Sequence, residues 1–219
     1  MAPSSYGDIH ASDNTIIHLG DNYNTLESEA IKADTARLVT ADERDEREAI
    51  LKWIHPDPHW TIHDRKHSDQ GSCDWLLQSP NFVKWSESET ATTFWLRGKM
   101  GFGKSHLTHA VIERTCSQHA VAYFYCNESI GLNDMLRTIL KQLVSVRASS
   151  PLPAVIVETF KKKQDQRPPN RTECVTLMNT CTTGLSSTEI AIDALDECPA
   201  NARDELMHTL ITWMQRNPS

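Results

Sequence analysis

The segment Gly98–Ser105, which reads Gly-Lys-Met-Gly-Phe-Gly-Lys-Ser, constrains this chain more than any other stretch. Its spacing matches the pattern G-x-x-x-x-G-K-S/T, in which successive backbone N–H groups form a concave nest for phosphate oxygens. The glycines at 98, 101 and 103 can adopt positive φ angles and allow the backbone to approach an anion closely. We therefore expect phosphate binding here; the alternative is a glycine-rich turn that has no ligand.

Each residue type in this motif has a role in binding a nucleotide. Lys104 can reach the β- and γ-phosphates, and the Ser105 hydroxyl can ligate Mg²⁺. A helix that begins near Gly103 would direct the positive end of its dipole at the anion. The candidate nucleotide-binding residues are Gly98, Lys99, Met100, Gly101, Phe102, Gly103, Lys104, Ser105 and His106.

The sequence on either side of the motif has the order that a phosphate-binding loop requires. Thr92–Arg97 is rich in β-branched and aromatic residues, which predicts a strand. After the motif, Leu107, Ala110, Val111 and Arg114 recur at helical spacing. The expected local structure is therefore strand, glycine turn and helix.

Three acidic residues form the second part of the candidate site. Asp193, Asp196 and Glu197 lie just past a strand predicted at 190–193, and ligands of open parallel sheets bind at that end of the strands. Asp193 is expected to hold Mg²⁺, directly or through its waters. Glu197 is the candidate general base for an attacking water, Asp196 would orient that base, and Lys104 would stabilise charge on the phosphoryl group. The alternative is an acidic loop that caps the next helix.

Strand and helix patterns alternate along the rest of the chain. The apolar run at 120–126 predicts another strand, and stripes of apolar residues predict several helices. This alternation indicates an α/β fold with a parallel sheet. The helices are expected at 132–146, at 154–163, from a Thr172 cap to Cys181, and at 200–215 with Leu206, Leu210, Ile211 and Met214 facing inward.

Composition changes divide the chain into three expected regions. Residues 1–30 are expected to be a flexible polar arm, residues 31–90 a helical lead-in, and residues 91–219 the core. In the lead-in, Ile50, Leu51 and Ile54 would share one face of a helix. Four large apolar residues are expected to pack, with a lining for an adenine ring as the alternative. They are Trp75, Leu76, Phe82 and Trp85.

Overall composition excludes several classes of function. The chain has 219 residues and a formal net charge of −7, which argues against a surface for unspecific binding of nucleic acid or anionic membranes. No apolar run approaches the ~18 residues that a membrane span needs. The N-terminal segment has no secretory signal, so we expect a cytoplasmic location.

Cysteine and histidine spacing gives no strong sign of a metal site. The six cysteines form no C-x-x-C pair and are expected to be thiols in a reducing compartment. His55, His59, His63 and His67 recur every four residues, as on a zinc-binding helix face. However, prolines at 56 and 58 would break that helix, so we expect polar loop histidines.

Taken together, these motifs resemble fungal NACHT-type signal-transduction NTPases of the STAND class, whose P-loop region is called nephrocystin-like at its N-terminus. Such domains occur in NOD-like and ankyrin-repeat proteins. The resemblance implies a three-layer P-loop NTPase parallel sheet with an N-terminal helical lead-in, and nucleotide-dependent protein partners or self-assembly. It rests on Gly98–Ser105 as Walker A, Asp193–Cys198 as an extended Walker B, and the segments 18–23, 50–54, 71–77, 82–85, 121–125 and 135–143.

Three departures from the family pattern stand out. Met100 and Phe102 occupy loop positions that often hold small residues or proline, although their side chains can point away. Glu189 stands where an apolar strand residue is expected, so the Walker B strand is predicted to be short or to start late. The chain ends at Ser219, whereas the family continues into a strand that lies between the Walker A and Walker B strands. We therefore expect an incomplete sheet and a core truncated after Walker B.

The function expected from these features is that of a switch that binds ATP or GTP with Mg²⁺ and hydrolyses it slowly. The sequence does not identify an arginine finger, for which Arg97 and Arg137 are the candidates. One alternative is a non-hydrolysing interaction or scaffold module from a truncated NTPase gene. A second is a small-molecule kinase, which would need an acceptor pocket and an arginine-rich lid that the sequence does not show.

Overall fold

The computed structural model describes residues 42–56, 73–88, 90–99, 101–116, 119–146, 151–163, 167–183, 185 and 187–216. By compactness the chain divides into Met1–Glu48 and Ala49–Ser219, and the following description concerns the second unit. The arm predicted at 1–30 lies outside the described residues, as do His59, His63 and His67. The region boundaries expected at 30 and 90 stay predictions.

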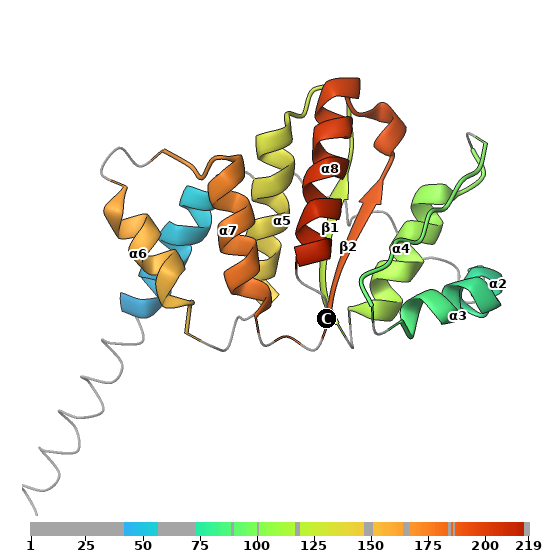
Figure 1. The fold of residues 1–219 in the computed structure, drawn as a ribbon, viewed down its shortest axis with the longest axis horizontal. Coiled ribbons are helices and arrows are strands. Elements are labelled where there is room, and N and C mark those ends of the chain that lie inside the picture. The colour runs from blue at the N-terminus through green and yellow to red at the C-terminus, as the bar shows by residue number, and fades with distance from the viewer. Residues whose placement is uncertain are drawn as a thin grey trace, which may run out of the picture. The chain divides into compact units, whose positions relative to one another are not determined.

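The centre of this unit is a parallel sheet in which β1 (Ala120–Tyr125) pairs with β2 (Thr188–Asp193) (Figure 1). The two strands are in register from Ala120 opposite Thr188 to Tyr125 opposite Asp193. Both strands were predicted, and their parallel pairing among many helices is compatible with the expected α/β fold. The prediction that the second strand starts late is wrong, because β2 includes Glu189, whose carboxylate lies 3.7 Å from His119 Nε2.

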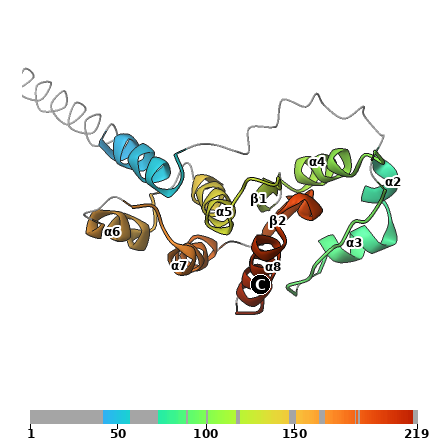
Figure 2. The same ribbon diagram turned by 90° about the horizontal axis from the view of Figure 1, so that it is seen from above.

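Helices flank these strands on both sides. Helices α4 (Lys104–Thr115) and α5 (Leu132–Val146) lie on opposite sides of the two strands in both views (Figures 1 and 2). Next to α5 lie α7 (Arg171–Thr182) and α6 (Ala154–Lys162), and α8 (Ala200–Arg216) lies in front of the strands in Figure 1. Among the described residues, no helix has the length and apolar character that crossing a bilayer requires.

The main core forms where α5 packs between β1 and α7. Its stripe of apolar residues is completely buried, as the sequence predicts: Met135, Leu136, Ile139, Leu140 and Leu143 each have 0% exposure. Ile50 and Ile54, at the end of the helix that is described from residue 42, join the same core. Burial of this stripe is the main source of stability, at about 25 cal/mol for each Å² of apolar surface removed from water.

Not every apolar residue that was expected to pack is buried. A second, smaller core lies at α2 (Asp74–Leu77) and α3 (Pro80–Ser86), where Leu76 and Phe82 are buried. The packing prediction is wrong for Trp75 and Ile211, which are 63% and 42% exposed. Both lie on the outer side of a helix whose inner side is already occupied, and short apolar patterns do not show which side has a neighbour.

A glutamine side chain covers the outer edge of β1. The Gln142 side chain accepts a hydrogen bond from the Tyr123 backbone N–H through Oε1 (3.0 Å) and donates one to the Tyr123 carbonyl through Nε2 (2.7 Å). An edge strand otherwise presents unpaired backbone groups that attract other strands. Gln142 is 8% exposed, so these bonds are shielded from water. Its amide makes the two hydrogen bonds that one residue of a neighbouring strand would make.

We predict that Gln142→Leu lowers the free energy of unfolding by about 1–3 kcal/mol, because it leaves the Tyr123 N–H and carbonyl without their partner. Urea unfolding followed by circular dichroism measures the change. Gln215→Leu, at an exposed position of α8, is the matched control and should change stability by less than about 0.5 kcal/mol. Equal effects of the two substitutions would contradict the role given to Gln142.

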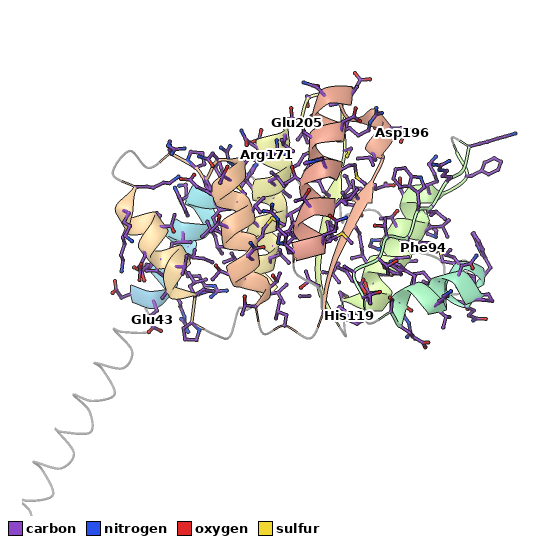
Figure 3. All side chains as sticks on the ribbon, in the orientation of Figure 1. Glu43, Phe94, His119, Arg171, Asp196 and Glu205 are labelled. Carbon is purple, nitrogen blue, oxygen red and sulfur yellow. The ribbon has the colours of Figure 1, made fainter. Side chains whose placement is uncertain are left out.

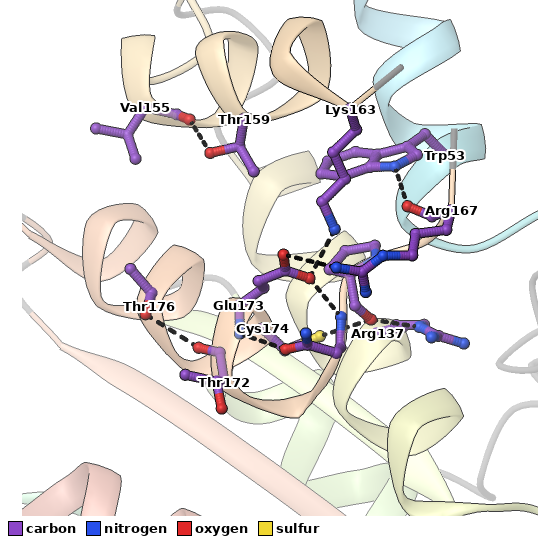
Figure 4. Close-up of polar contacts among 12 residues, drawn as sticks. Trp53, Arg137, Val155, Thr159, Lys163, Arg167, Thr172, Glu173, Cys174 and Thr176 are labelled. Carbon is purple, nitrogen blue, oxygen red and sulfur yellow. Dashed lines mark hydrogen bonds and ion pairs between the residues drawn. The ribbon is translucent and has the colours of Figure 1, made fainter. Parts of the chain in front are cut away.

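Helix α7 begins with a complete capping box, shown in Figure 4. The Asn170 side chain accepts from the Glu173 N–H (3.0 Å), and the Glu173 carboxylate accepts from the Asn170 N–H (2.8 Å). The predicted cap at Thr172 is therefore wrong, because Asn170 already satisfies the N-terminal donors two residues earlier.

The same carboxylate joins α7 to neighbouring segments. Lys163 Nζ lies 2.6 Å from Glu173 Oε2 and 5.6 Å from the centre of the Trp53 ring, and Trp53 donates to the Arg167 carbonyl (2.8 Å) (Figure 4). Burial by itself would raise the pKa of Glu173. The hydrogen bonds from Lys163 and from the Asn170 N–H, with the charges of Lys163 and Arg167, outweigh burial and lower this pKa.

A lowered pKa means that this carboxylate stabilises the fold above its unfolded-state pKa of about 4.3, and that the contribution is lost as the pH falls through the folded-state value. We predict that Glu173→Gln costs about 1–2 kcal/mol at pH 7, and much less once the pH has fallen below the lowered folded-state pKa of Glu173. Urea unfolding across this pH range measures the difference. Glu158→Gln removes an exposed i,i+4 pair with Lys162 and is the control, with little effect at any pH.

Candidate functional site

A cavity of about 510 Å³ opens between β2 and the segment that precedes the glycine motif. Residues 93–98 line one side without a break and residues 189–196 line the other. Helix α4 contributes Lys104 and Thr108, and α8 contributes Arg203 and Met207. The two parts of the site that the sequence indicated therefore face one cavity.

This cavity explains why the strand predicted at Thr92–Arg97 is absent. Residues 91–99 are described without strand structure, and within the described chain β2 pairs with β1 alone. A strand requires a neighbour within hydrogen-bonding distance, and the cavity lies between this segment and the free edge of β2. The gap coincides with the position at which the family resemblance places a further strand.

The glycine motif forms a turn that closes around its own lysine. Lys104 Nζ donates to the carbonyl oxygens of Gly98 (3.0 Å) and Lys99 (3.3 Å). Gly101 and Gly103 have φ angles of 81° and 76°, so positive φ is confirmed at these positions, whereas Gly98 does not adopt it. A side chain at 98 would lie against the Lys104 chain instead, with a Cβ 3.7 Å from its Cγ.

Other residues of the motif are placed less directly at the cavity. Phe102 is 71% exposed, so its side chain points away as expected, and Met100 lies outside the described residues. Ser105, in the first turn of α4, is half-buried, and His106 is exposed. Neither residue lines the cavity, in contrast to Lys104, which lies just before them.

Asp193 is the buried acid of the site. It ends β2 with 7% exposure, and its carbonyl accepts from the Cys126 N–H (3.0 Å). The Thr108 hydroxyl lies 3.5 Å from Asp193 Oδ1 and 3.1 Å from the Lys104 carbonyl, and it can donate to one of them at a time. Thr108, which the sequence analysis did not single out, therefore places a hydroxyl of α4 beside the buried acid.

The chain turns sharply directly after Asp193. Ala194 has a φ of 53°, and it is the only non-glycine residue with positive φ among the described residues. This conformation costs an L-residue about 1–2 kcal/mol and leads into the short 3₁₀ helix Leu195–Glu197, labelled at Asp196 in Figure 3. Asp196 thereby lines the cavity, whereas Glu197 is exposed and is not part of its lining.

The two arginines proposed as candidate fingers differ in position. Arg97 lines the cavity and stacks on Trp95, with its Cζ 5.4 Å from the ring centre. Arg137 donates to the Pro169 carbonyl (2.7 Å) and to Asp134 (3.1 Å), so it joins α5 to the start of α7 and does not line the cavity. Arg203, which the sequence analysis missed, does line it.

Burial favours the protonated form of two thiols, Cys126 and Cys198. Burial and a hydrogen bond with Cys198 raise the pKa of Cys126 far above its ordinary value, and burial likewise raises the pKa of Cys198. Both thiols stay protonated and are therefore poor nucleophiles. None of the six cysteines forms a disulfide. The described residues contain no group of three or more side chains suited to hold a metal ion without help from another ligand.

The fold and the site define an α/β protein in which a glycine turn and a strand-end acid share one cavity. The family model described as Nephrocystin 3, N-terminal matches residues 71–219, and the chain belongs to this family. Comparison with curated proteins and with solved structures found no match.

Proposed function

We propose that this chain is a NACHT-like P-loop NTPase domain of the STAND class that binds ATP or GTP with Mg²⁺. The proposed core is a three-layer P-loop sheet. The observation that carries the proposal is that Lys104 and Asp193 line one cavity, with the Thr108 hydroxyl on α4 within 3.5 Å of the Asp193 carboxylate. A cytoplasmic switch that changes its protein partners or self-assembles with the bound nucleotide is the function that fits this site.

The loop would bind the phosphates through its backbone N–H groups and through Lys104. The ammonium group of Lys104 donates hydrogen bonds to two loop carbonyls, and it would exchange them for the more negative phosphate oxygens. Positive φ at Gly101 and Gly103 turns the backbone at the start of α4, so the helix dipole favours an anion there.

The acids fit a hard cation that is bound together with phosphate. Asp193 is buried and lines the cavity, as does Thr108, whose hydroxyl is a further oxygen donor on α4. Ser105, the motif residue expected to ligate Mg²⁺, lies in the first turn of α4 outside this lining, so its role as a ligand stays a prediction. Mg²⁺ commonly binds through one or two carboxylates plus phosphate oxygens, so few protein ligands are sufficient. When bound, the ion would neutralise phosphate charge; Asp193 would hold it in the cavity.

We predict that Lys104→Ala lowers the affinity for an ATP analogue at least about 100-fold, because the charge-assisted bonds to phosphate are lost. Titration of a fluorescent ATP analogue in the presence of Mg²⁺ measures this change. Lys162→Ala is the control, since Lys162 is an exposed lysine of α6 far from the motif in sequence. Unchanged affinity in Lys104→Ala would refute nucleotide binding at this loop.

Asp193→Asn tests the proposed role in Mg²⁺ binding. The amide is nearly isosteric and keeps an oxygen near Thr108 but loses the charge that attracts the cation. We expect the Mg²⁺ concentration that half-saturates nucleotide-induced thermal stabilisation to rise about tenfold or more, with smaller change in affinity without Mg²⁺. An identical Mg²⁺ dependence in the wild type and in Asp193→Asn would exclude this role.

One observation favours a module that binds nucleotide without hydrolysing it. Glu197, the candidate general base, does not line the cavity. A general base must lie about 2.6–3.2 Å, heavy atom to heavy atom, from the group whose proton it removes, or one water away. Measurement of phosphate release from ATP distinguishes the two functions. Release that depends on Glu197 and Asp196 supports an NTPase, whereas tight binding without release supports the scaffold.

A further inference from the structure

We propose that Arg203 binds the terminal phosphate of the nucleotide and makes the site selective for a triphosphate over a diphosphate. This inference rests on the proposed nucleotide-binding function and adds to it a residue outside both motifs. It follows from the position of Arg203 on the cavity wall, from the interactions of its guanidinium group and from the charges that surround it.

Helix α8 places Arg203 at the cavity that α4 also lines. Ala202 and Leu206 are buried in the main core and fix the orientation of the first two turns of α8. Arg203 and Met207, one turn apart, then face the cavity that Lys104 lines from α4. Two cationic residues from different helices therefore line one cavity, which suits groups that bind successive parts of a phosphate chain.

The guanidinium group of Arg203 has donors available for such a ligand. Its Nε donates to Asp204 Oδ1 (3.1 Å), and this pair is largely exposed, so the interaction is weak. Within the described part of the chain, its two terminal nitrogens form no hydrogen bond or ion pair. These two nitrogens form the planar fork that binds two phosphate oxygens at once.

Other cations at the cavity are held in place by neighbouring groups. Lys104 donates to two loop carbonyls and Arg97 stacks on Trp95. The lining also contains three acids, of which Glu189 lies near His119 and Asp193 near Thr108. With Mg²⁺ held at Asp193, Asp196 still adds negative charge to the lining, and the positive charge of Arg203 in the same lining favours entry of an anion.

Lys104 and Arg203 would bind different phosphates of the nucleotide. The glycine turn and Lys104 hold the phosphates nearest to the loop, which a diphosphate also has. Arg203, which lines the same cavity from α8 and follows Asp196 by only a few residues in the chain, would contact the phosphate farthest from the nucleoside. A diphosphate lacks this group, so loss of Arg203 should weaken triphosphate binding selectively.

The test compares Arg203→Ala and Arg203→Lys with the wild type, using the full chain with Mg²⁺. Fluorescent ADP and a fluorescent non-hydrolysable ATP analogue are titrated in parallel. We expect Arg203→Ala to weaken binding of the triphosphate about 10- to 100-fold and of ADP less than about threefold, with partial recovery in Arg203→Lys. Arg216→Ala, at the exposed end of the same helix, is the control and should leave both affinities unchanged.

The possible outcomes separate this inference from the proposed function. If the wild type binds both nucleotides and Arg203→Ala weakens them equally or not at all, selectivity by Arg203 is refuted while nucleotide binding stands. If the wild type binds neither nucleotide, both proposals fail. Urea unfolding of each variant shows whether it is folded, and Arg203→Gln, which keeps the side chain's bulk without charge, replaces Arg203→Ala if that variant is unfolded.

Discussion

The parallel pairing of β1 with β2 is the interaction on which the rest of this structure depends. It fixes the register that places Asp193 opposite Tyr125 and brings the carbonyl of Asp193 within hydrogen-bonding distance of the Cys126 N–H. A shift of this register by one residue would turn the side chain of Asp193 to the other face of the sheet. The position of the buried acid is thus a consequence of backbone pairing between segments more than 60 residues apart in the chain.

The two edges of this small sheet have different neighbours. The Gln142 side chain covers the edge of β1, and a buried glutamine is a costly residue unless both ends of its amide have partners, as they do here. The edge of β2 borders a cavity instead, and the positive φ of Ala194 turns the chain so that Asp196 returns to that cavity. The backbone of β1 is hydrogen-bonded at its outer edge, whereas the edge of β2 borders the cavity. The polar residues of the candidate site therefore gather at the edge of β2.

Local patterns in the sequence were sufficient to predict most of the helices and strands. The apolar stripe of α5 and the apolar run of β1 each have one strong period, and the structure contains both where they were expected. Thr92–Arg97 has the composition of a strand but no neighbour, so composition was not sufficient there. The cap of α7 fell two residues before the expected threonine, because Asn170 and Glu173 satisfy each other and the sequence contains several possible caps.

The sequence by itself determined the glycine spacing, the lysine that follows it and the acids after a strand, because these depend on residue type and on order along the chain. The tertiary structure decided which residues meet: Thr108 beside Asp193, Arg203 on the cavity wall, and Arg137 and Glu197 away from it. These placements depend on strand register and on how α4 and α8 pack on the sheet. Such long-range contacts have no period in the sequence, since they arise from burial of apolar surface that is shared among distant segments.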